Sequence, residues 1–400
     1  MDAFSNFISY FFSPAAWTFL KTIADACSTP TGFLIWTTLL KSAILLGVIL
    51  GLVSYTVYAE RRVSALIQDR LGPNRVGWQG LLQPIADAAK LLLKENFTPK
   101  NANYFYFRLA PKLVMVPPIL VMGVIPFGSS LFGVPMTIAS LNVGAIYVLA
   151  ISSISVYGIV LAGWASNSKY PFLGGIRSTS QMISYELSLA LSIVPVFMIV
   201  GSLNLDTIVQ YQVERGWMIA PFWPQGLSWH SLFHPTEAWK AVLAGITLRH
   251  LLLWMPLIIS FFVFFVSMFA ETNRLPFDLP EAEQELIGGY HTEYSSMGFA
   301  LFFLGEYTAM IAGASFITTL FLGGWSLPLV PDGSHGWFWG LVNIAVFFAK
   351  IIALLFVFIW VRWTLPRFRY DQLMKLGWYF FFELAIVNIF LTALILTYVK

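Results

Sequence analysis

Residues 250–270 read HLLLWMPLIISFFVFFVSMFA, and residues 298–323 read GFALFFLGEYTAMIAGASFITTLFLG. Each run is long enough to cross the apolar core of a bilayer as one helix, which takes roughly 20 residues. These runs, together with six others like them, predict an all-α polytopic membrane protein with about eight transmembrane helices. The six others are residues 33–58, 107–128, 142–163, 180–201, 338–361 and 377–398.

The composition supports a membrane protein and excludes several kinds of site. Of the 400 residues, 58% are hydrophobic and 11% are charged, whereas soluble domains are about 25% charged. The single cysteine, Cys27, excludes an internal disulfide and an iron–sulfur cluster held by this chain alone. His230 and His234 are four residues apart, but they flank a proline-rich loop, so we predict no metal site. No nucleotide-binding or haem motif is present, so no redox cofactor is expected on this chain.

The lysine and arginine residues predict the orientation in the membrane. Sixteen of the 23 lie in or beside the loops that follow the odd-numbered runs, and six lie on the other side. Because cytoplasmic loops are enriched in Lys and Arg, we expect both termini on the outward side. The expected cytoplasmic loops are residues 59–106, 164–179, 271–297 and 362–376, and the long outward segment is residues 202–249.

Residues 33–400 are expected to form one transmembrane domain. An aromatic, amphipathic segment, residues 1–32, precedes it and is expected to lie at the membrane interface. Prolines inside the runs, such as Pro117, Pro195 and Pro256, predict kinked helices.

The first cytoplasmic loop opens with Glu60, Arg61 and Arg62 at the membrane edge. Residues 79–94 carry apolar side chains at helical spacing, which predicts an amphipathic helix. Asp87 falls within this apolar pattern, so it makes either a helix contact or part of a polar pocket.

An acidic loop joins the two runs quoted first. Residues 270–294 read AETNRLPFDLPEAEQELIGGYHTEY, with six acids and one cation, Arg274. Glu281 and Glu285 are four residues apart and would share one face of a helix, where like charges repel and favour binding of a proton. The loop suits proton uptake or relay, docking to a basic partner surface, or both. The acids are Glu271, Asp278, Glu281, Glu283, Glu285 and Glu293.

Four charged residues fall inside the apolar runs: Glu186, Glu306, Lys350 and Glu383. An unpaired charge in lipid is costly, so each must face protein, water or a partner. We expect a functional role for Glu186 and Glu306, and expect Glu306, which follows FFLG, to exchange a proton. A structural contact between helices is the alternative for each acid, and Lys350 is a candidate counter-ion.

Four long stretches carry a family resemblance. They are residues 59–95 (AERRVSALIQDRLGPNRVGWQGLLQPIADAAKLLLKE), 163–186 (GWASNSKYPFLGGIRSTSQMISYE), 270–307 (AETNRLPFDLPEAEQELIGGYHTEYSSMGFALFFLGEY) and 365–374 (LPRFRYDQLM). They closely resemble the H subunit of bacterial NADH:quinone oxidoreductase, or respiratory complex I, which is the counterpart of mitochondrial NADH dehydrogenase subunit 1. The resemblance covers about residues 33–398.

The resemblance implies a membrane subunit of a proton-translocating enzyme in the bacterial cytoplasmic (inner) membrane. Such a subunit forms the quinone chamber with the hydrophilic arm and carries an acidic path that couples quinone reduction to proton pumping. The quinone, ubiquinone or menaquinone, is the substrate, while NADH, FMN and the iron–sulfur clusters belong to partner subunits. The partners are hydrophilic quinone-module subunits on the cytoplasmic side, small membrane subunits and antiporter-like subunits.

The resemblance also implies roles for individual residues. By motif position, the quinone-binding residues are Arg61, Asp87, Arg362, Asp278, Glu281, Phe299 and Phe303. The proton path contains Glu186, Glu271, Glu283, Glu285, Glu293 and Glu306.

Two other classes of protein remain open on the sequence. One is the homologous membrane subunit of an energy-converting hydrogenase, which works without quinone. The other is a stand-alone secondary transporter, against which the eight runs show no evident internal repeat and the acids cluster at one membrane face. The subunits that co-purify with this chain would distinguish these three classes of protein.

The orientation yields a direct test by cysteine labelling. In a background in which Cys27 is replaced by serine, Gly333→Cys should react with an impermeant thiol reagent in intact cells, because residue 333 is expected outside. Gln372→Cys should react only after the membrane is opened. The reverse pattern of labelling would overturn the topology.

Overall fold

A computed structural model describes residues 30–131, 134–219, 248–278, 289–327 and 337–398. The chain forms two compact units, residues 1–48 and residues 49–400. In the first unit the described residues belong to the first part of helix α3 (Pro30–Ile67). Most of the expected interfacial segment 1–32, as well as His230 and His234, lies outside the described residues.

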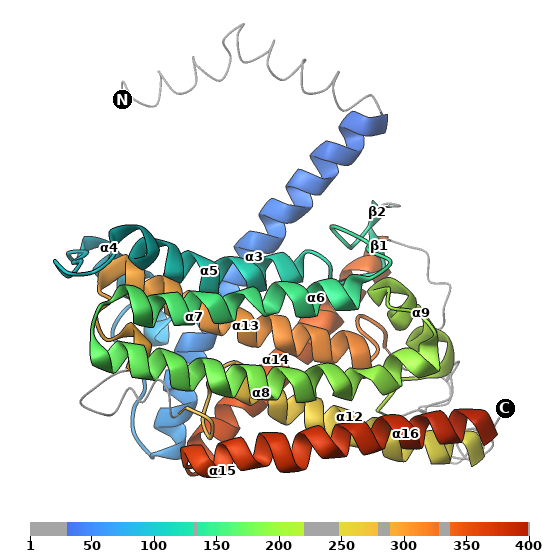
Figure 1. Ribbon diagram of the computed structural model, residues 1–400. Helices are drawn as coiled ribbons and strands as arrows, with labels where there is room; N and C mark the ends of the chain where they lie inside the picture. Colours follow the sequence, from blue (N-terminus) through green and yellow to red (C-terminus); the bar gives the residue numbers. More distant parts are fainter. Residues whose placement is uncertain (1–29, 132–133, 220–247, 279–288, 328–336, 399–400) are drawn as a thin grey trace, which may run out of the picture. The chain divides into compact units, whose positions relative to one another are not determined.

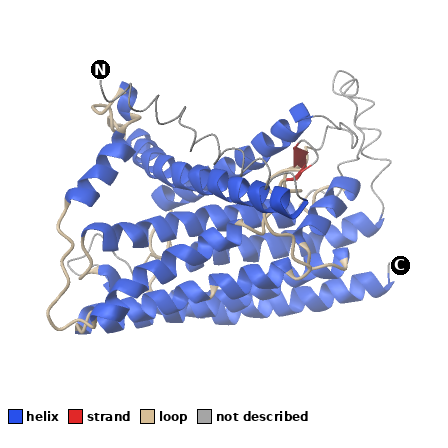
Figure 2. Ribbon diagram, turned by 90° about the horizontal axis from the view of Figure 1, so that it is seen from above, coloured by secondary structure: helices blue, strands red, loops and turns tan. Residues whose placement is uncertain are grey.

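The described chain is almost entirely helical (Figure 1, Figure 2). Eight helical segments are long and apolar enough to cross a membrane, which confirms the predicted all-α fold class. After α3 the helices are α4 (Gln83–Leu93), α5 (Tyr104–Met122), α6 (Gly144–Ser152), α7 (Ile154–Ala165), α8 (Lys169–Val200), α9 (Leu205–Arg215), α12 (Leu248–Glu271), α13 (Ser296–Phe321), α14 (Trp337–Thr364), α15 (Tyr370–Lys375) and α16 (Phe382–Tyr398). Shorter elements are η1 (Trp78–Gly80), η2 (Gly289–His291), the π-helical η3 (Leu376–Phe381) and the hairpin β1 (Ser130–Leu131) and β2 (Val134–Pro135).

Helix α13 is the central helix of the second unit. In its most apolar stretch 72% of the residues are buried, against 22–44% in the other seven spans. It packs against α5, α14, α12, α9 and α4, and α8 in turn packs against α7, α12 and α16 (Figure 1). The buried position of α13 makes any charge on it dependent on partners from other helices.

Small residues allow the helices around α13 to approach closely. The side chain of Val114 on α5 lies between Gly158 of α7 and Gly305 of α13. A Cβ atom added at Gly158 would lie 2.6 Å from Val114 Cγ2, and one at Gly305 would lie 2.9 Å from Val114 Cγ1. Close backbone approach through small residues is the usual way in which membrane helices associate.

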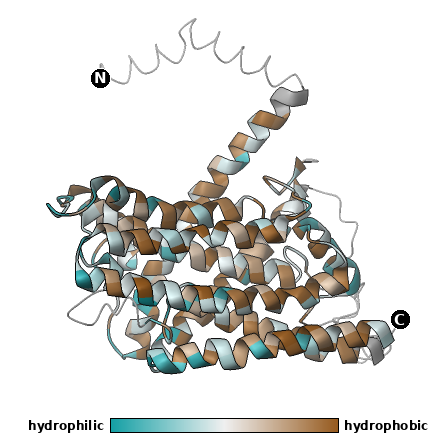
Figure 3. Cartoon of the chain, in the orientation of Figure 1, coloured by the Kyte–Doolittle hydropathy of each residue, from teal (hydrophilic) through white to brown (hydrophobic). Residues whose placement is uncertain are grey.

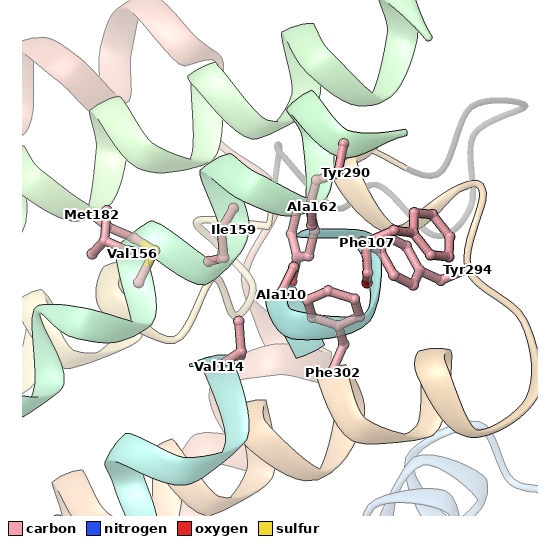
Figure 4. Close-up of a cluster of buried hydrophobic side chains, with 11 residues drawn as sticks. Phe107, Ala110, Val114, Val156, Ile159, Ala162, Met182, Tyr290, Tyr294 and Phe302 are labelled. Carbon is pink, nitrogen blue, oxygen red and sulfur yellow. The ribbon is translucent and has the colours of Figure 1, made fainter. Parts of the chain in front are cut away.

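Aromatic side chains close the core at one end of these helices (Figure 4). The ring of Phe107 on α5 stacks on Tyr294, with centroids 4.0 Å apart, and the Tyr294 hydroxyl donates to the Phe107 carbonyl oxygen at 3.1 Å. Phe302 of α13 packs edge-on against Tyr294 and Tyr290. The stacked rings fix the end of the acidic loop, residues 289–294, onto α5 and α13.

Figure 3 shows the helices coloured mainly hydrophobic, with the hydrophilic residues gathered near helix ends and loops.

The helices differ from the predicted runs in two respects. The run 142–163 is not one helix but two, because α6 ends at Ser152 and α7 begins at Ile154. The hydroxyls of Ser152, Ser153 and Ser155 each donate to a carbonyl three residues earlier, and such bonds compete with the regular helical pattern. By contrast, α8 begins eleven residues before its run, and α3 continues nine residues beyond its run.

Lys350 on α14 caps the C-terminal end of α13. Its Nζ donates to the carbonyl oxygens of Leu322, Gly324 and Ser326 at 2.7, 2.9 and 2.7 Å. It also lies 4.1 Å from the centre of the Trp217 ring. A cation is favourable at the C-terminal end of a helix, where carbonyl groups lack partners. Among the described residues, the partners of Lys350 are thus carbonyl oxygens, and none is a carboxylate.

Replacing Lys350 by methionine is therefore expected to destabilise the protein. The Lys350→Met change removes one donor group from three carbonyl oxygens, which should cost roughly 3 kcal/mol of unfolding free energy. The apparent melting temperature of the purified protein measures the loss. Lys375→Met, at an exposed position in α15, is the control and should melt like the wild type. Equal melting of both variants would contradict the capping role.

Candidate functional site

Glu60 is a buried carboxylate on the inward face of α3. It is 6% exposed, and the buried residues Val53, Thr56, Glu60 and Ser64 follow one another at intervals of three or four. This is the spacing of one helix face. The next residue, Arg61, lies off this face and is exposed. A buried carboxylate on this face needs positive or hydrogen-bonding partners.

Three side chains from two helices and the acidic loop supply these partners. Glu60 Oε1 pairs with the guanidinium of Arg362 on α14. Glu60 Oε2 lies 3.4 Å from Arg274 Nη1 and accepts a hydrogen bond from the Tyr307 hydroxyl at 2.7 Å. The carboxylate of Glu60 is thus shared between two arginines.

Arg274 connects Glu60 to Glu306. Its Nε forms an ion pair with Glu306 Oε1, and its guanidinium lies 4.2 Å from the centre of the Tyr307 ring. Burial acts to lower the pKa of Arg274, but Glu306, Tyr307 and Glu60 outweigh it and raise that pKa above its ordinary value. Arg274 therefore stays charged. We call Arg362, Glu60, Arg274 and Glu306 the ionic cluster, in which positive and negative charges alternate and balance.

Two further acids lie beyond the ionic cluster. Glu271, at the end of α12, and Glu306 line the same cavity of about 80 Å³ between α5, α7, α8, α12 and α13. A cavity of this volume can hold water. Glu186 on α8 is close enough to Glu271 for their charges to repel. Neither acid has an ion pair within the described part of the chain.

The fold supplies the partner that a charge at Glu306 requires. The sequence neighbours of Glu306 are apolar except for Tyr307, but the fold brings Arg274, 32 residues away in sequence, against it. Whether Glu306 has a functional or a purely structural role, that role therefore includes its ion pair with Arg274.

Comparison with known proteins identifies the family. The sequence model described as NADH dehydrogenase matches residues 40–393. The chain belongs to the NADH dehydrogenase family.

Three relatives from bacteria agree with this assignment. The first H subunit of the NADH-quinone oxidoreductase of Geobacter metallireducens is 47% identical over 372 residues, 92% of this chain and 99% of that protein. The H subunit of the Rickettsia typhi enzyme is 49% identical over 350 residues, 86% of this chain and 89% of that protein. NADH-quinone oxidoreductase subunit 8 of Rhodothermus marinus is 45% identical over 370 residues, 90% of this chain and 97% of that protein. The family resemblance stated from the sequence is confirmed.

Several residues predicted for quinone binding in this NADH dehydrogenase family member lie outside the ionic cluster. Arg61 Nη1 pairs with Asp87 Oδ2 at 2.6 Å, with 50% and 24% of the two side chains exposed. Asp278 pairs with Arg367 at 3.2 Å. Of the predicted quinone-binding residues, Arg362 belongs to the cluster itself.

Phe299 and Phe303 form an aromatic group with His291 near the start of α13. The two phenylalanine rings are 4.6 Å apart, and the ring of His291 is 5.5 Å from that of Phe299. Glu293 lies in the same stretch, partly buried. The described residues contain no group of three His, Cys, Asp or Glu side chains that could hold a metal ion. Glu281, Glu283 and Glu285 lie outside the described residues.

The sequence reasoning missed three residues of the site: Glu60, Arg274 and Tyr307. For Glu60 a signal was available, because the helical spacing of Val53, Thr56 and Ser64 places it on the buried face. Arg274 was noted only as the single cation of the acidic loop. Its role depends on contacts across more than 200 residues with Glu60, which no local pattern reveals.

The buried imidazole of His291 should make the stability of the folded protein depend on pH. Burial lowers its pKa to about 4, from an ordinary value near 6.5. The unfolded chain therefore binds a proton below about pH 6.5 that the folded chain does not bind until about pH 4, and stability falls over this window. The full loss corresponds to roughly 3 kcal/mol. Melting temperatures measured from pH 8 to pH 5 should fall less in His291→Phe than in the wild type. Parallel curves would contradict a buried neutral histidine.

Proposed function

We propose that this chain forms the quinone chamber of an NADH:quinone oxidoreductase together with its hydrophilic arm, and couples quinone reduction to proton pumping. The observation that carries the proposal is the line of ionisable side chains from Arg362 through the ionic cluster to Glu186. It draws on five helices, α14, α3, α13, α12 and α8. Ionisable side chains inside a membrane protein are energetically costly, and they usually mark a functional site.

The chemistry of quinone reduction fits these residues. Forming a quinol takes two electrons and two protons, and the new negative charge must be stabilised until the protons arrive. Electrons would come from iron–sulfur clusters in partner subunits, which receive them from NADH and FMN. Arg61 with Asp87, Asp278, Glu281 and the Phe299–Phe303 pair are proposed to contact the quinone, with Arg362 on the cluster side. Guanidinium groups offer hydrogen-bond donors to the carbonyl oxygens of a quinone.

The proton path is proposed to run from the acidic loop through the ionic cluster into the cavity. Glu306 and Glu271 both line the cavity, and Glu186 lies next along the path. Thr272, Asn273 and the serines at the α6–α7 break also line it and offer hydroxyl and amide groups to water. Glu283, Glu285 and Glu293 are proposed to feed protons from the cytoplasmic side.

The setting of the chain is proposed to be the bacterial cytoplasmic membrane, with both termini in the periplasm. Its partners would be the hydrophilic quinone-module subunits, the small membrane subunits and the antiporter-like subunits. The names of the bacterial relatives favour this assembly over an energy-converting hydrogenase, because each is called an NADH-quinone oxidoreductase subunit.

Two substitutions of Glu306 test the proposal. Glu306→Gln keeps the shape and a hydrogen bond to Arg274 but removes the proton-binding group, so quinone-linked turnover and proton translocation should fall strongly. Glu306→Asp still titrates and should retain part of both activities. NADH–quinone activity and the pH gradient in proteoliposomes measure the two functions.

A purely structural role predicts the opposite order, with Gln tolerated better than Asp because it reaches as far toward Arg274. Glu383→Gln, at an exposed acid on α16, is the control and should pump normally. Full activity and pumping in Glu306→Gln would remove Glu306 from the proton path.

A further inference from the structure

A single buried amide on α8 holds both ends of the segment that carries Arg274. Gln181 is 0% exposed, and its Nε2 lies 2.9 Å from the carbonyl oxygen of Ala270 and 2.9 Å from that of Phe277. We call residues 270–277, between these two carbonyls, the acidic-loop turn. Gln181 Nε2 also lies 3.2 Å from Asn273 Oδ1, inside the turn.

A second contact fixes the middle of the acidic-loop turn to the same face of α8. Asn273 has a left-handed φ of 49°, and its Nδ2 donates to Ser178 Oγ at 3.0 Å. Ser178 lies one helical turn before Gln181. The edge of the Phe277 ring packs against Tyr185, one turn after Gln181, at 5.3 Å. Three successive turns of α8 therefore hold this segment.

Arg274 follows Asn273 directly, so its position depends on these contacts. Its backbone N–H donates to the Phe269 carbonyl at 3.0 Å, and its own carbonyl accepts from the Phe277 N–H at 2.7 Å. The described side-chain contacts of Gln181 include none with Arg274, Glu60 or Glu306. Gln181 therefore acts on the ionic cluster only through the acidic-loop turn, by its contacts with two backbone carbonyls and with Asn273.

We propose that Gln181 is a positioning residue of the ionic cluster, because its amide sets where the Arg274 guanidinium lies between Glu60 and Glu306. The inference rests on the proposed function, since it assumes that the geometry of the cluster matters for turnover. One guanidinium serves two carboxylates here, and its planar fork leaves little freedom for displacement. Small displacements of catalytic or charged groups can lower rates by about 100-fold.

A displaced Arg274 changes the charge environment of every group that faces it. These groups are Glu60 on α3 and Glu306 and Tyr307 on α13, with Arg362 of α14 on the far side of Glu60. Glu271 shares the cavity with Glu306. Moving the Arg274 guanidinium would change the electrostatic field at these groups, so the pH profile of quinone reduction should shift.

The chain offers a matched control in a second buried glutamine. Gln212 on α9 is 1% exposed. Its Nε2 donates to the Thr319 carbonyl at 2.8 Å, and its Oε1 accepts from the Gly323 N–H at 2.9 Å. Gln212 thus ties a loop to a helix through its amide as Gln181 does, but at the end of α13 remote from Glu306. Gln181→Met and Gln212→Met keep the side-chain length and remove the same kind of hydrogen bonds.

The experiment compares the two variants in the purified complete enzyme. NADH oxidation by an artificial acceptor, which bypasses the quinone site, gives the amount of assembled enzyme in each preparation. Per assembled enzyme, Gln181→Met should lower kcat for quinone reduction by about 10-fold or more with a small change in KM. Its pH profile should shift, whereas Gln212→Met should keep the wild-type profile even if it lowers the melting temperature.

Gln181→Glu gives an independent readout. An ionised carboxylate cannot donate to the carbonyls of Ala270 and Phe277, but a protonated one can. Activity of Gln181→Glu should therefore recover as the pH is lowered, which Gln181→Met cannot do. If Gln181→Met fails to assemble, this acid recovery decides the question alone, and its absence overturns the proposal.

Two further outcomes would overturn the positioning role. One is a wild-type pH profile in assembled Gln181→Met, and the other is an equal shift in Gln212→Met.

A double variant, Gln181→Met with Glu306→Gln, separates this inference from the proposed proton path. If Gln181 acts through Arg274 and Glu306, the two effects on kcat must be less than multiplicative. If Glu306→Gln alone pumps fully, the proton path fails, while the shifted pH profile of Gln181→Met still supports positioning.

Discussion

The charge of one buried arginine, Arg274, needs partners, and this need determines which helices must pack together. Arg274 is 5% exposed, and in such surroundings an unpaired charge is costly, so removing one member of a buried pair typically costs about 3–5 kcal/mol. Its partners Glu60 and Glu306 come from α3 and α13, and Glu60 in turn needs Arg362 from α14. Three helices and a loop therefore have to meet at one point. The acids that continue the line, Glu271 and Glu186, have no cationic partner within the described part of the chain.

The two ends of α13 are stabilised by cations in different ways. Near its start, Arg274 pairs with the carboxylates of Glu60 and Glu306, which come from two different helices. At its far end, Lys350 donates to three backbone carbonyl oxygens. The first end thus depends on side chains from α3 and the acidic loop, whereas the second end is held through backbone groups.

Hydropathy alone predicted the eight spans, because roughly twenty consecutive apolar residues leave few alternatives to a membrane helix. It could not predict that the run 142–163 divides at Ser153, since that depends on hydroxyl groups competing for backbone carbonyls. Among the charged residues, Glu186 and Glu306 stood out because charge is rare in apolar runs, whereas Glu271 was noted in the acidic loop and Arg362 through the family resemblance. Arg274 and Tyr307 gained their importance only from contacts between segments distant in sequence. The carbonyl partners of Lys350 could not be predicted either, because backbone acceptors leave no pattern in a sequence.

The close approach at Val114 limits what the wall of the cavity tolerates. Val114 and Gly305 line the cavity, and a Cβ atom added at Gly158 or Gly305 would lie less than 3.0 Å from the Val114 side chain. A residue larger than glycine at either position would therefore force Val114 or the helices around it to shift. The shape of a cavity that Glu271 and Glu306 share is thus set in part by two positions that carry neither a side chain nor a charge.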